Sequence, residues 1–141
     1  MKLVIHTDGG SRGNPGQAAV GAVIQRSEVS SQESEEEIIK IGRTIGIKTN
    51  NEAEYMAVIV ALEEVINRKI APDQIDFVLD SLLVVNQLKG SYKVKQAHLQ
   101  ELLLQIRKLE QQIGAKMAYS HVLRGENREA DRLVNEALDS A

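Results

Sequence analysis

The amino-acid sequence predicts an α/β fold in which a mixed β-sheet is covered by helices. Its apolar residues follow strand-like patterns in three successive segments, and helical and strand-like segments alternate from residue 51 onward. The predicted order is therefore β-β-β-α-β-α-α-β-α, and the two prolines, Pro15 and Pro72, both fall between elements. An antiparallel start followed by alternating strands and helices is typical of a mixed sheet.

The five strands are predicted from short runs rich in Val, Ile and Ala. They are expected at residues 3–5, 18–24, 38–47, 75–79 and 116–122. The second and third runs are separated by the acidic segment 30–37, SSQESEEE. Its composition predicts a solvent-exposed hairpin connection.

Four helices are predicted where apolar residues recur every three or four positions. They are expected at residues 51–69, 81–88, 96–113 and 127–138. Asn50 or Asn51 is available to cap the first helix. Gly90 and Gly114 follow the second and third helices and are expected to end them.

The composition indicates one soluble globular domain spanning residues 1–141, with 43% hydrophobic and 26% charged residues. There is no cysteine, which excludes disulfides, thiolate zinc sites and thiol nucleophiles and fits a cytoplasmic location. No apolar run approaches the ~20 residues that cross a bilayer, so no membrane partner is expected. Only 3% of the residues are aromatic, which argues against a stacking platform for single-stranded nucleic acid.

The formal net charge of −3 argues, taken alone, against a polyanionic partner. Bound divalent cations can reverse this inference, because two such ions would make the total charge positive. The charge therefore leaves nucleic acid open as a substrate.

Titratable residues stand at the ends of three predicted strands: Asp8, Asp80 and His121. If these strands are parallel, their carboxyl ends share one edge of the sheet, where open α/β sheets bind ligands. Asp80 has an alternative role, because Asp is also a common helix cap and a predicted helix follows it directly.

Two further segments carry polar residues toward the same edge. Residues 9–16, GGSRGNPG, are expected to form a glycine-rich loop after Asp8 that exposes its backbone to a ligand. The segment lacks the Gly-Lys-Ser/Thr of a phosphate-binding loop and does not lead into a helix, so it is not a nucleotide cradle. Residues 49–55 open the first long helix with Glu52 and Glu54, which either stabilise the helix dipole or serve a site.

Four motifs in order resemble type 1 ribonuclease H from residue 3 to about residue 137. They are TDGGSRGNPG at 7–16, TNNEAEY at 49–55, LDS at 79–81 and HVLRGENREADRLVNEA at 121–137. The resemblance implies a ribonuclease H-like five-stranded mixed sheet of order 3-2-1-4-5 with helices on both faces. It also implies an endonuclease that cleaves the RNA strand of RNA/DNA hybrids.

The resemblance assigns the catalytic residues by position. The implied metal-binding carboxylates are Asp8, Glu54, Asp80 and Asp131, and His121 matches a histidine that assists proton movement. The implied cofactor is two Mg²⁺ ions, with Mn²⁺ as substitute, and carboxylate oxygens suit both metals. Carboxylates clustered without a cation would repel one another, so their convergence would itself point to function.

The resemblance also assigns substrate contacts. Asn14, Asn50 and Asn51 match residues that contact RNA 2′-hydroxyls and base edges, and Thr49 matches a residue that holds a DNA phosphate. Many relatives carry a tryptophan-rich basic protrusion at residues 90–96, where this shorter form retains only Tyr92, Lys93 and Lys95. Binding of the hybrid is expected to be weaker or more salt-sensitive than in relatives that carry the protrusion. Double-stranded RNA is an alternative partner, and a monomeric state is expected.

Two other function classes compete with this interpretation. One is a non-catalytic module that recognises hybrid or double-stranded RNA, although all four acidic positions are filled. The other is a different nuclease or a transposase-like enzyme, since a fold does not determine a function. The short chain has no large insertion for such specialised work.

Overall fold

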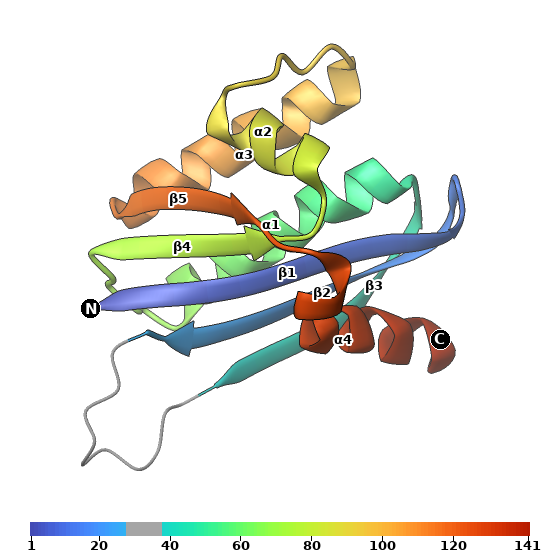
Figure 1. Ribbon diagram of the computed structural model, residues 1–141, viewed down its shortest axis with the longest axis horizontal. Coiled ribbons are helices and arrows are strands. Elements are labelled where there is room, and N and C mark those ends of the chain that lie inside the picture. Colours follow the sequence, from blue (N-terminus) through green and yellow to red (C-terminus); the bar gives the residue numbers. More distant parts are fainter. Residues whose placement is uncertain (28–37) are drawn as a thin grey trace.

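The computed structural model describes residues 1–27 and 38–141, and its centre is a five-stranded mixed sheet (Figure 1). The strands are β1 (Lys2–Gly13), β2 (Gly16–Arg26), β3 (Ile39–Lys48), β4 (Gln74–Leu79) and β5 (Lys116–His121). Their order is β3-β2-β1-β4-β5, which confirms the predicted 3-2-1-4-5 sheet. The acidic segment 30–37 lies outside the described residues.

The strand directions confirm that three carboxyl ends meet at one edge. β1 pairs parallel with β4, and β4 pairs parallel with β5. β2 is antiparallel to both β1 and β3. β1 itself continues to Gly13, but Asp8, Asp80 and His121 all lie toward this same edge.

The prediction of a glycine-rich loop after Asp8 was wrong. β1 continues through this segment and pairs with β2 from Gly9 opposite Val20 to Gly13 opposite Gly16. Only two residues turn the hairpin, so the backbone that looked free for a ligand is bound in the ladder. Glycine is depleted in strands for want of a side chain to pack, which made the segment look like a loop.

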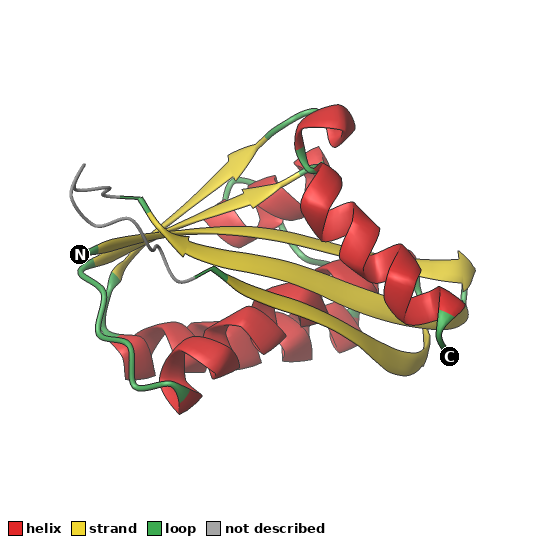
Figure 2. Ribbon diagram, turned by 90° about the horizontal axis from the view of Figure 1, so that it is seen from below, coloured by secondary structure: helices red, strands yellow, loops and turns green. Residues whose placement is uncertain are grey.

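The helices cover both faces of the sheet (Figure 2). They are α1 (Asn50–Asn67), α2 (Leu82–Lys89), α3 (Ala97–Ile113) and α4 (Arg128–Asp139), preceded by a short 3₁₀ helix, η1 (Arg124–Glu126), that was not predicted. α4, which leads to the C-terminus, lies on one face, and α1 with α3 lies on the other. As predicted, α2 and α3 end at Gly90 and Gly114.

The main core lies between the sheet and α1, and it is largely aliphatic. Its largest fully buried side chains include Tyr55, Phe77, Leu3, Ile5, Ile24 and Leu62. A smaller cluster of Ala19, Val134 and Leu138 holds α4 to the opposite face. Among the described residues, no helix has the length and apolar content needed to cross a membrane.

The helix caps differ from the sequence prediction in a way that matters for the site. Thr49, and not Asn50 or Asn51, caps α1: its Oγ1 accepts the N–H of Glu52 at 3.1 Å, and a Glu52 carboxylate oxygen accepts the Thr49 N–H at 2.9 Å. Ser81, and not Asp80, caps α2 by accepting the Val84 N–H at 3.3 Å. Asp80 is therefore free of the capping role that offered an alternative explanation for it.

Candidate active site

Three carboxylates from separate elements converge at the carboxyl edge of the sheet. Asp8 comes from the middle of β1, Glu54 from the first turns of α1, and Asp80 from the residue after β4. One carboxylate oxygen of each lies within 4.8 Å of those of the other two. Such spacing is what a shared cation requires of its ligands.

A close approach of α1 to β1 brings Glu54 beside Asp8. A Cβ on Gly9 would lie 2.2 Å from the carbonyl carbon and oxygen of Ala53 and 2.6 Å from the Glu54 nitrogen. Only glycine leaves room for this crossing. The glycine that sequence reasoning placed in a loop thus sets the spacing of the two carboxylates.

Asp131 reaches the same cleft from the opposite face of the sheet. α4 lies so close to β2 that a Cβ on Gly21 would be 2.3 Å from the Ala130 carbonyl oxygen. Asp131 is outside the group of three that share the 4.8 Å spacing, yet it is near enough to raise the pKa of Asp8. Its own ion partner is Arg124 of η1, with Nη2 3.6 Å from Oδ1.

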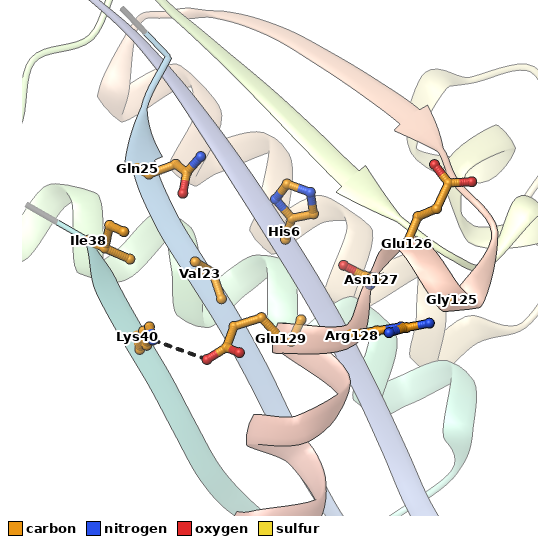
Figure 3. Close-up of a pocket in the computed structure, with 11 residues that line it drawn as sticks. His6, Val23, Gln25, Ile38, Lys40, Gly125, Glu126, Asn127, Arg128 and Glu129 are labelled. Atoms are coloured by element: carbon orange, nitrogen blue, oxygen red, sulfur yellow. Dashed lines mark ion pairs between the residues drawn. The ribbon is translucent and has the colours of Figure 1, made fainter. Parts of the chain in front are cut away.

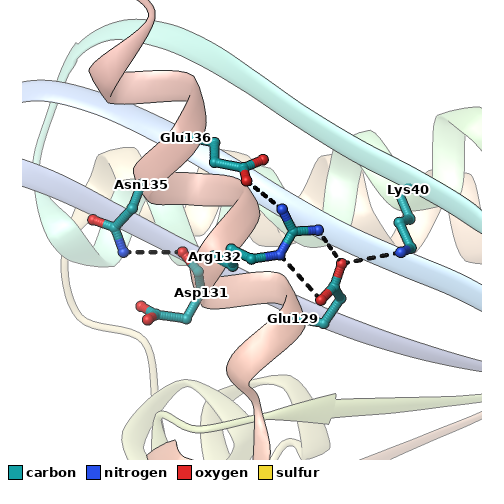
Figure 4. Close-up of polar contacts among 6 residues, drawn as sticks. All are labelled: Lys40, Glu129, Asp131, Arg132, Asn135 and Glu136. Carbon is teal, nitrogen blue, oxygen red and sulfur yellow. Dashed lines mark hydrogen bonds and ion pairs between the residues drawn. The ribbon is translucent and has the colours of Figure 1, made fainter.

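A polar network fixes the first turn of α4 to the sheet (Figure 4). Glu129 pairs with Lys40 of β3 at 3.2 Å and with Arg132, which also pairs with Glu136. The Asp131 carboxylate points away from this network, and Asn135 donates to its backbone carbonyl at 3.0 Å. Asp131 therefore faces the cleft on a different side of α4 from these ion pairs.

Burial and mutual repulsion make this cluster unfavourable when it is fully ionised. Burial, followed by the charges of Asp80 and Asp131, raises the pKa of Asp8 to about 7. Burial and the charges of Asp8 and Asp80 also raise the pKa of Glu54 well above its ordinary value. Both groups therefore favour a bound proton or a neighbouring cation.

The donor set fits a hard divalent cation. Glu54 Oε2 is buried with no hydrogen-bond partner among the described residues, and the converging ligands are all carboxylate oxygens. Oxygen-only sites of this kind suit Mg²⁺ or Mn²⁺. A cation would satisfy the orphaned oxygen and offset the repulsion.

The carboxylates open into a cleft of 340 Å³ at the edge of the sheet. Its polar lining comes from Asp8, Ser11, Arg12, Asn50, Glu54, Asp80, Arg124, Asp131 and Asn135. Arginine side chains at the rim are placed to meet an anionic group such as a phosphate.

The expected substrate residues fall into two groups joined by the start of α1. Asn14 Oδ1 accepts the Asn50 N–H at 3.0 Å, and Asn50 Oδ1 accepts the Ser11 N–H at 2.9 Å. These contacts hold the tip of the hairpin against the helix, beside the acidic cleft. Each asparagine keeps its amide N–H groups free of any described partner and available to a ligand.

The second group lines a separate hollow of 540 Å³ that includes Asn51, Lys93 and Lys95. Because Asn50 and Asn51 are consecutive, the start of α1 forms the boundary between the two hollows. Thr49, which is half-buried, lines neither hollow and uses its hydroxyl as the helix cap. A single extended ligand could therefore contact both groups.

His121 is at the edge that the sequence predicts, but it does not line the acidic cleft. His121 is the last residue of β5 and pairs with Leu79, the residue that precedes Asp80. The His121 side chain is exposed. No contact between His121 and the carboxylates is present among the described residues.

Comparison with known proteins shows which proteins this chain is similar to. The family model described as reverse transcriptase-like matches residues 6–137. The crystal structure of RNase H1 from the halophilic archaeon Halobacterium salinarum aligns with a TM-score of 0.85 and 39% identity, over all of both chains. The chain belongs to the type 1 ribonuclease H family.

Two further relatives support this membership. The crystal structure of LC11-RNase H1 in complex with an RNA/DNA hybrid aligns with a TM-score of 0.85 and 36% identity, over 98% of this chain and 97% of that one. The bifunctional protein Rv2228c of Mycobacterium tuberculosis is 40% identical over 141 residues. The chain spans only 36% of the length of that mycobacterial protein, although all of the chain is matched.

Two residues of this ribonuclease H chain were missed by sequence reasoning. Arg124 lines the acidic cleft and pairs with Asp131, but it belongs to η1, which has no recognisable sequence pattern. Asn127 is buried and contacts Asp80, but an Asn before a helix predicts a cap. Asn127 was missed because helix capping already explained an Asn at that position.

A further hollow of 470 Å³ lies on the other side of the turn that leads into α4 (Figure 3). His6 of β1, Lys40 of β3 and Glu129 of α4 are among its lining residues. Burial lowers the pKa of His6, which favours its neutral form. Asn127 lies in the wall between this hollow and the carboxylates.

Proposed function

We propose that this chain is a metal-dependent endoribonuclease that cleaves the RNA strand of RNA/DNA hybrids by two-metal-ion catalysis. The observation that carries the proposal is the convergence of Asp8, Glu54 and Asp80, whose ligand oxygens lie within 4.8 Å of one another. Membership of the type 1 ribonuclease H family supports the same conclusion.

The proposed cation ligands are Asp8, Glu54 and Asp80, with Asp131 completing the set from α4. Two bound divalent cations would supply the positive charge that stabilises the entering and leaving oxygens of a phosphodiester displacement. The protein's own part is to hold four acidic side chains, carried by different elements, in one orientation before the substrate arrives.

Selection of the RNA strand is proposed for the asparagines beside the cleft. Only RNA carries a 2′-hydroxyl, which can donate and accept a hydrogen bond. Asn50 lines the cleft, Asn14 accepts the Asn50 N–H beside it, and Asn51 lines the neighbouring hollow. A hybrid that spans both hollows would present its RNA strand to these asparagines. LC11-RNase H1, which binds an RNA/DNA hybrid in its crystal structure, offers a precedent.

The experiment that tests this proposal uses the full chain and end-labelled duplexes. With Mg²⁺ or Mn²⁺ we expect cleavage within the RNA strand of a hybrid, and with EDTA we expect none. Double-stranded RNA and double-stranded DNA of the same sequence serve as comparison substrates. Cleavage in EDTA, or equal cleavage of the DNA duplex, would contradict the proposal. Binding of the hybrid without cleavage would favour the non-catalytic module instead.

His121→Ala is expected to slow turnover by about 10- to 100-fold without abolishing it, as expected when a general acid or base is lost. The exposed ring is free to move from the end of β5 toward a substrate. Single-turnover and steady-state rates, compared with the parent protein, distinguish an effect on chemistry from one on product release. An unchanged rate in both would show that His121 takes no part.

Replacing Lys93 and Lys95 by alanine should weaken hybrid binding and flatten its salt dependence. Both lysines are exposed on the hollow beside α1, and each phosphate that the protein no longer neutralises reduces the steepness of log K against log salt by about one. Binding is measured in EDTA, so that cleavage does not interfere. The matched control replaces Lys108 and Lys116, two exposed lysines outside this hollow, by alanine. Equal slopes of log K against log salt for the two double variants would show that Lys93 and Lys95 do not contact the hybrid.

A further inference from the structure

The side chain of Asn127 joins two strands of the sheet from the start of α4. It is 1% exposed, and its Nδ2 donates to the Thr7 carbonyl oxygen at 2.9 Å and to Asp80 Oδ2 at 3.3 Å. Thr7 directly precedes Asp8 on β1, and Asp80 follows β4. One amide group therefore links the two strands at the point where each presents a carboxylate.

Asn127 does not use this side chain to cap its helix. An Asn at this position commonly accepts an N–H of the first turn, but no such bond is formed here. Its backbone still begins the helix, because its carbonyl oxygen accepts the Asp131 N–H at 3.2 Å. The same residue thus connects Asp8 and Asp80 on the sheet with Asp131 on α4.

Only the donor half of the amide is used. Asn127 Oδ1 is buried with no hydrogen-bond partner among the described residues, whereas Nδ2 has two acceptors. The two bonds donated by Nδ2 therefore hold the buried amide in place, and Oδ1 contributes none. This indicates that asparagine is needed at position 127 for the bonds that it donates. An aspartate of the same shape has no N–H to donate and would add another negative charge.

We infer that Asn127 is a positioning residue that fixes the Asp80 carboxylate and the start of α4 in the orientation that a cation needs. By holding one Asp80 oxygen, the amide restricts rotation of the carboxylate about its side-chain bonds. Because the amide is neutral, it does so without introducing a positive charge that would compete with the cation. The effect on cation binding rests on the proposed function, while the link between Asn127 and Asp80 does not.

The first test is a double-mutant cycle in EDTA, which requires neither cation nor substrate. Asn127→Ala, Asp80→Ala and the double variant are compared with the parent protein by urea unfolding. If Asn127 holds Asp80, Asn127→Ala should lower the folding equilibrium constant by about 3- to 10-fold more when Asp80 is present than when it is absent. Additive effects would overturn the inference, whatever the result of the cleavage assay.

The second test measures Mg²⁺ binding by calorimetry and the Mg²⁺ midpoint of cleavage. We expect Asn127→Ala to raise the Mg²⁺ dissociation constant and the Mg²⁺ midpoint of cleavage, each by about 10-fold. This is within the range seen when groups that orient metal ligands are removed. Asn127→Ser retains a residue favoured as a helix cap and is expected to show the same shift. Full recovery in the serine variant would assign Asn127 to helix capping alone and overturn the inference.

The matched control is Asn86→Ala, which removes an amide that donates to the Leu82 carbonyl oxygen at 3.0 Å on α2. It should leave the Mg²⁺ midpoint unchanged and show no coupling to Asp80→Ala. If the parent protein cleaves no hybrid, the proposed function fails but the stability cycle still tests the contact. If Asn127→Ala does not fold, the cycle is run from Asn127→Ser.

Discussion

Asp8→Asn is expected to lower hybrid cleavage by about 1,000-fold or more while leaving the protein folded. Asp8 is the carboxylate at the centre of the cluster, because its oxygen lies near those of Glu54 and Asp80 and its pKa responds to Asp131. The neutral amide keeps the shape of the side chain but removes its charge and one anionic ligand. Cleavage of a labelled hybrid at saturating Mg²⁺ measures the loss.

The same substitution is expected to stabilise the cation-free protein near neutral pH. Burial and the neighbouring carboxylates raise the pKa of Asp8 from 3.8 to about 7 in the folded state, so the folded protein holds a proton that the unfolded chain releases. Stability linked to this proton is present at acidic pH and is lost as the pH rises toward about 7. For a shift of this size the cost reaches at most about 4 kcal/mol.

Urea unfolding in EDTA at about pH 5 and about pH 8 tests this linkage. The parent protein should lose stability between the two pH values, and Asp8→Asn should lose less. Added Mg²⁺ should restore the parent protein at the higher pH and have little effect on the variant. Normal turnover by Asp8→Asn would refute the metal scheme, and a pH-independent parent protein would contradict the raised pKa of Asp8.

Gly9→Ala is expected to destabilise the protein by about 3 kcal/mol or more, and to abolish cleavage in whatever fraction folds. The added Cβ would lie 2.2 Å from backbone atoms of Ala53 on α1, and backbone cannot rotate aside as a side chain can. Relief requires α1 to move away from β1, which would carry Glu54 away from Asp8. Urea unfolding and the cleavage assay measure the two consequences.

Gly10→Ala is the matched control, one position along the same strand. Its Cβ would point to the opposite face and meet only Val134 Cγ1 at 3.8 Å, an ordinary van der Waals contact. The variant should therefore fold and cleave much like the parent protein. Similar losses in both variants would mean that any side chain in this part of β1 is harmful, and that the contact with α1 is not the cause.

The order and type of the elements could be predicted because they depend on local patterns. The alternation of apolar segments led to the mixed sheet, and the parallel pairing of β1 with β4 confirmed that Asp8 and Asp80 share one edge. The motif resemblance indicated the family correctly. The roles assigned to the site residues by that resemblance stay predictions, which the variants above test.

Local rules failed where a residue serves a distant contact. Gly9 lies in a strand paired opposite Val20, although glycine favours loops, and the close crossing of α1 explains why the residue there is glycine. Thr49 displaced the expected asparagine caps, and Glu52 three residues later completes a reciprocal capping box with it. This left the asparagines that follow Thr49 available to a ligand. Glu54 has the same spacing from Asn51, but its carboxylate lies with Asp8 and Asp80 instead.

The sequence by itself determined the order and type of the elements and the acidic residues that stand near the ends of the predicted strands. The direction of the strands was left as a condition, which the parallel pairing of β1, β4 and β5 met. Only the tertiary structure decided that Asp8, Glu54 and Asp80 are close enough to share a cation, and that Asn127 bonds to Asp80. The physical reason is range: strand and helix patterns arise between residues a few positions apart. The spacing of the carboxylates depends on how closely α1 and α4 pack on the sheet. That packing is set by contacts between residues far apart in the chain.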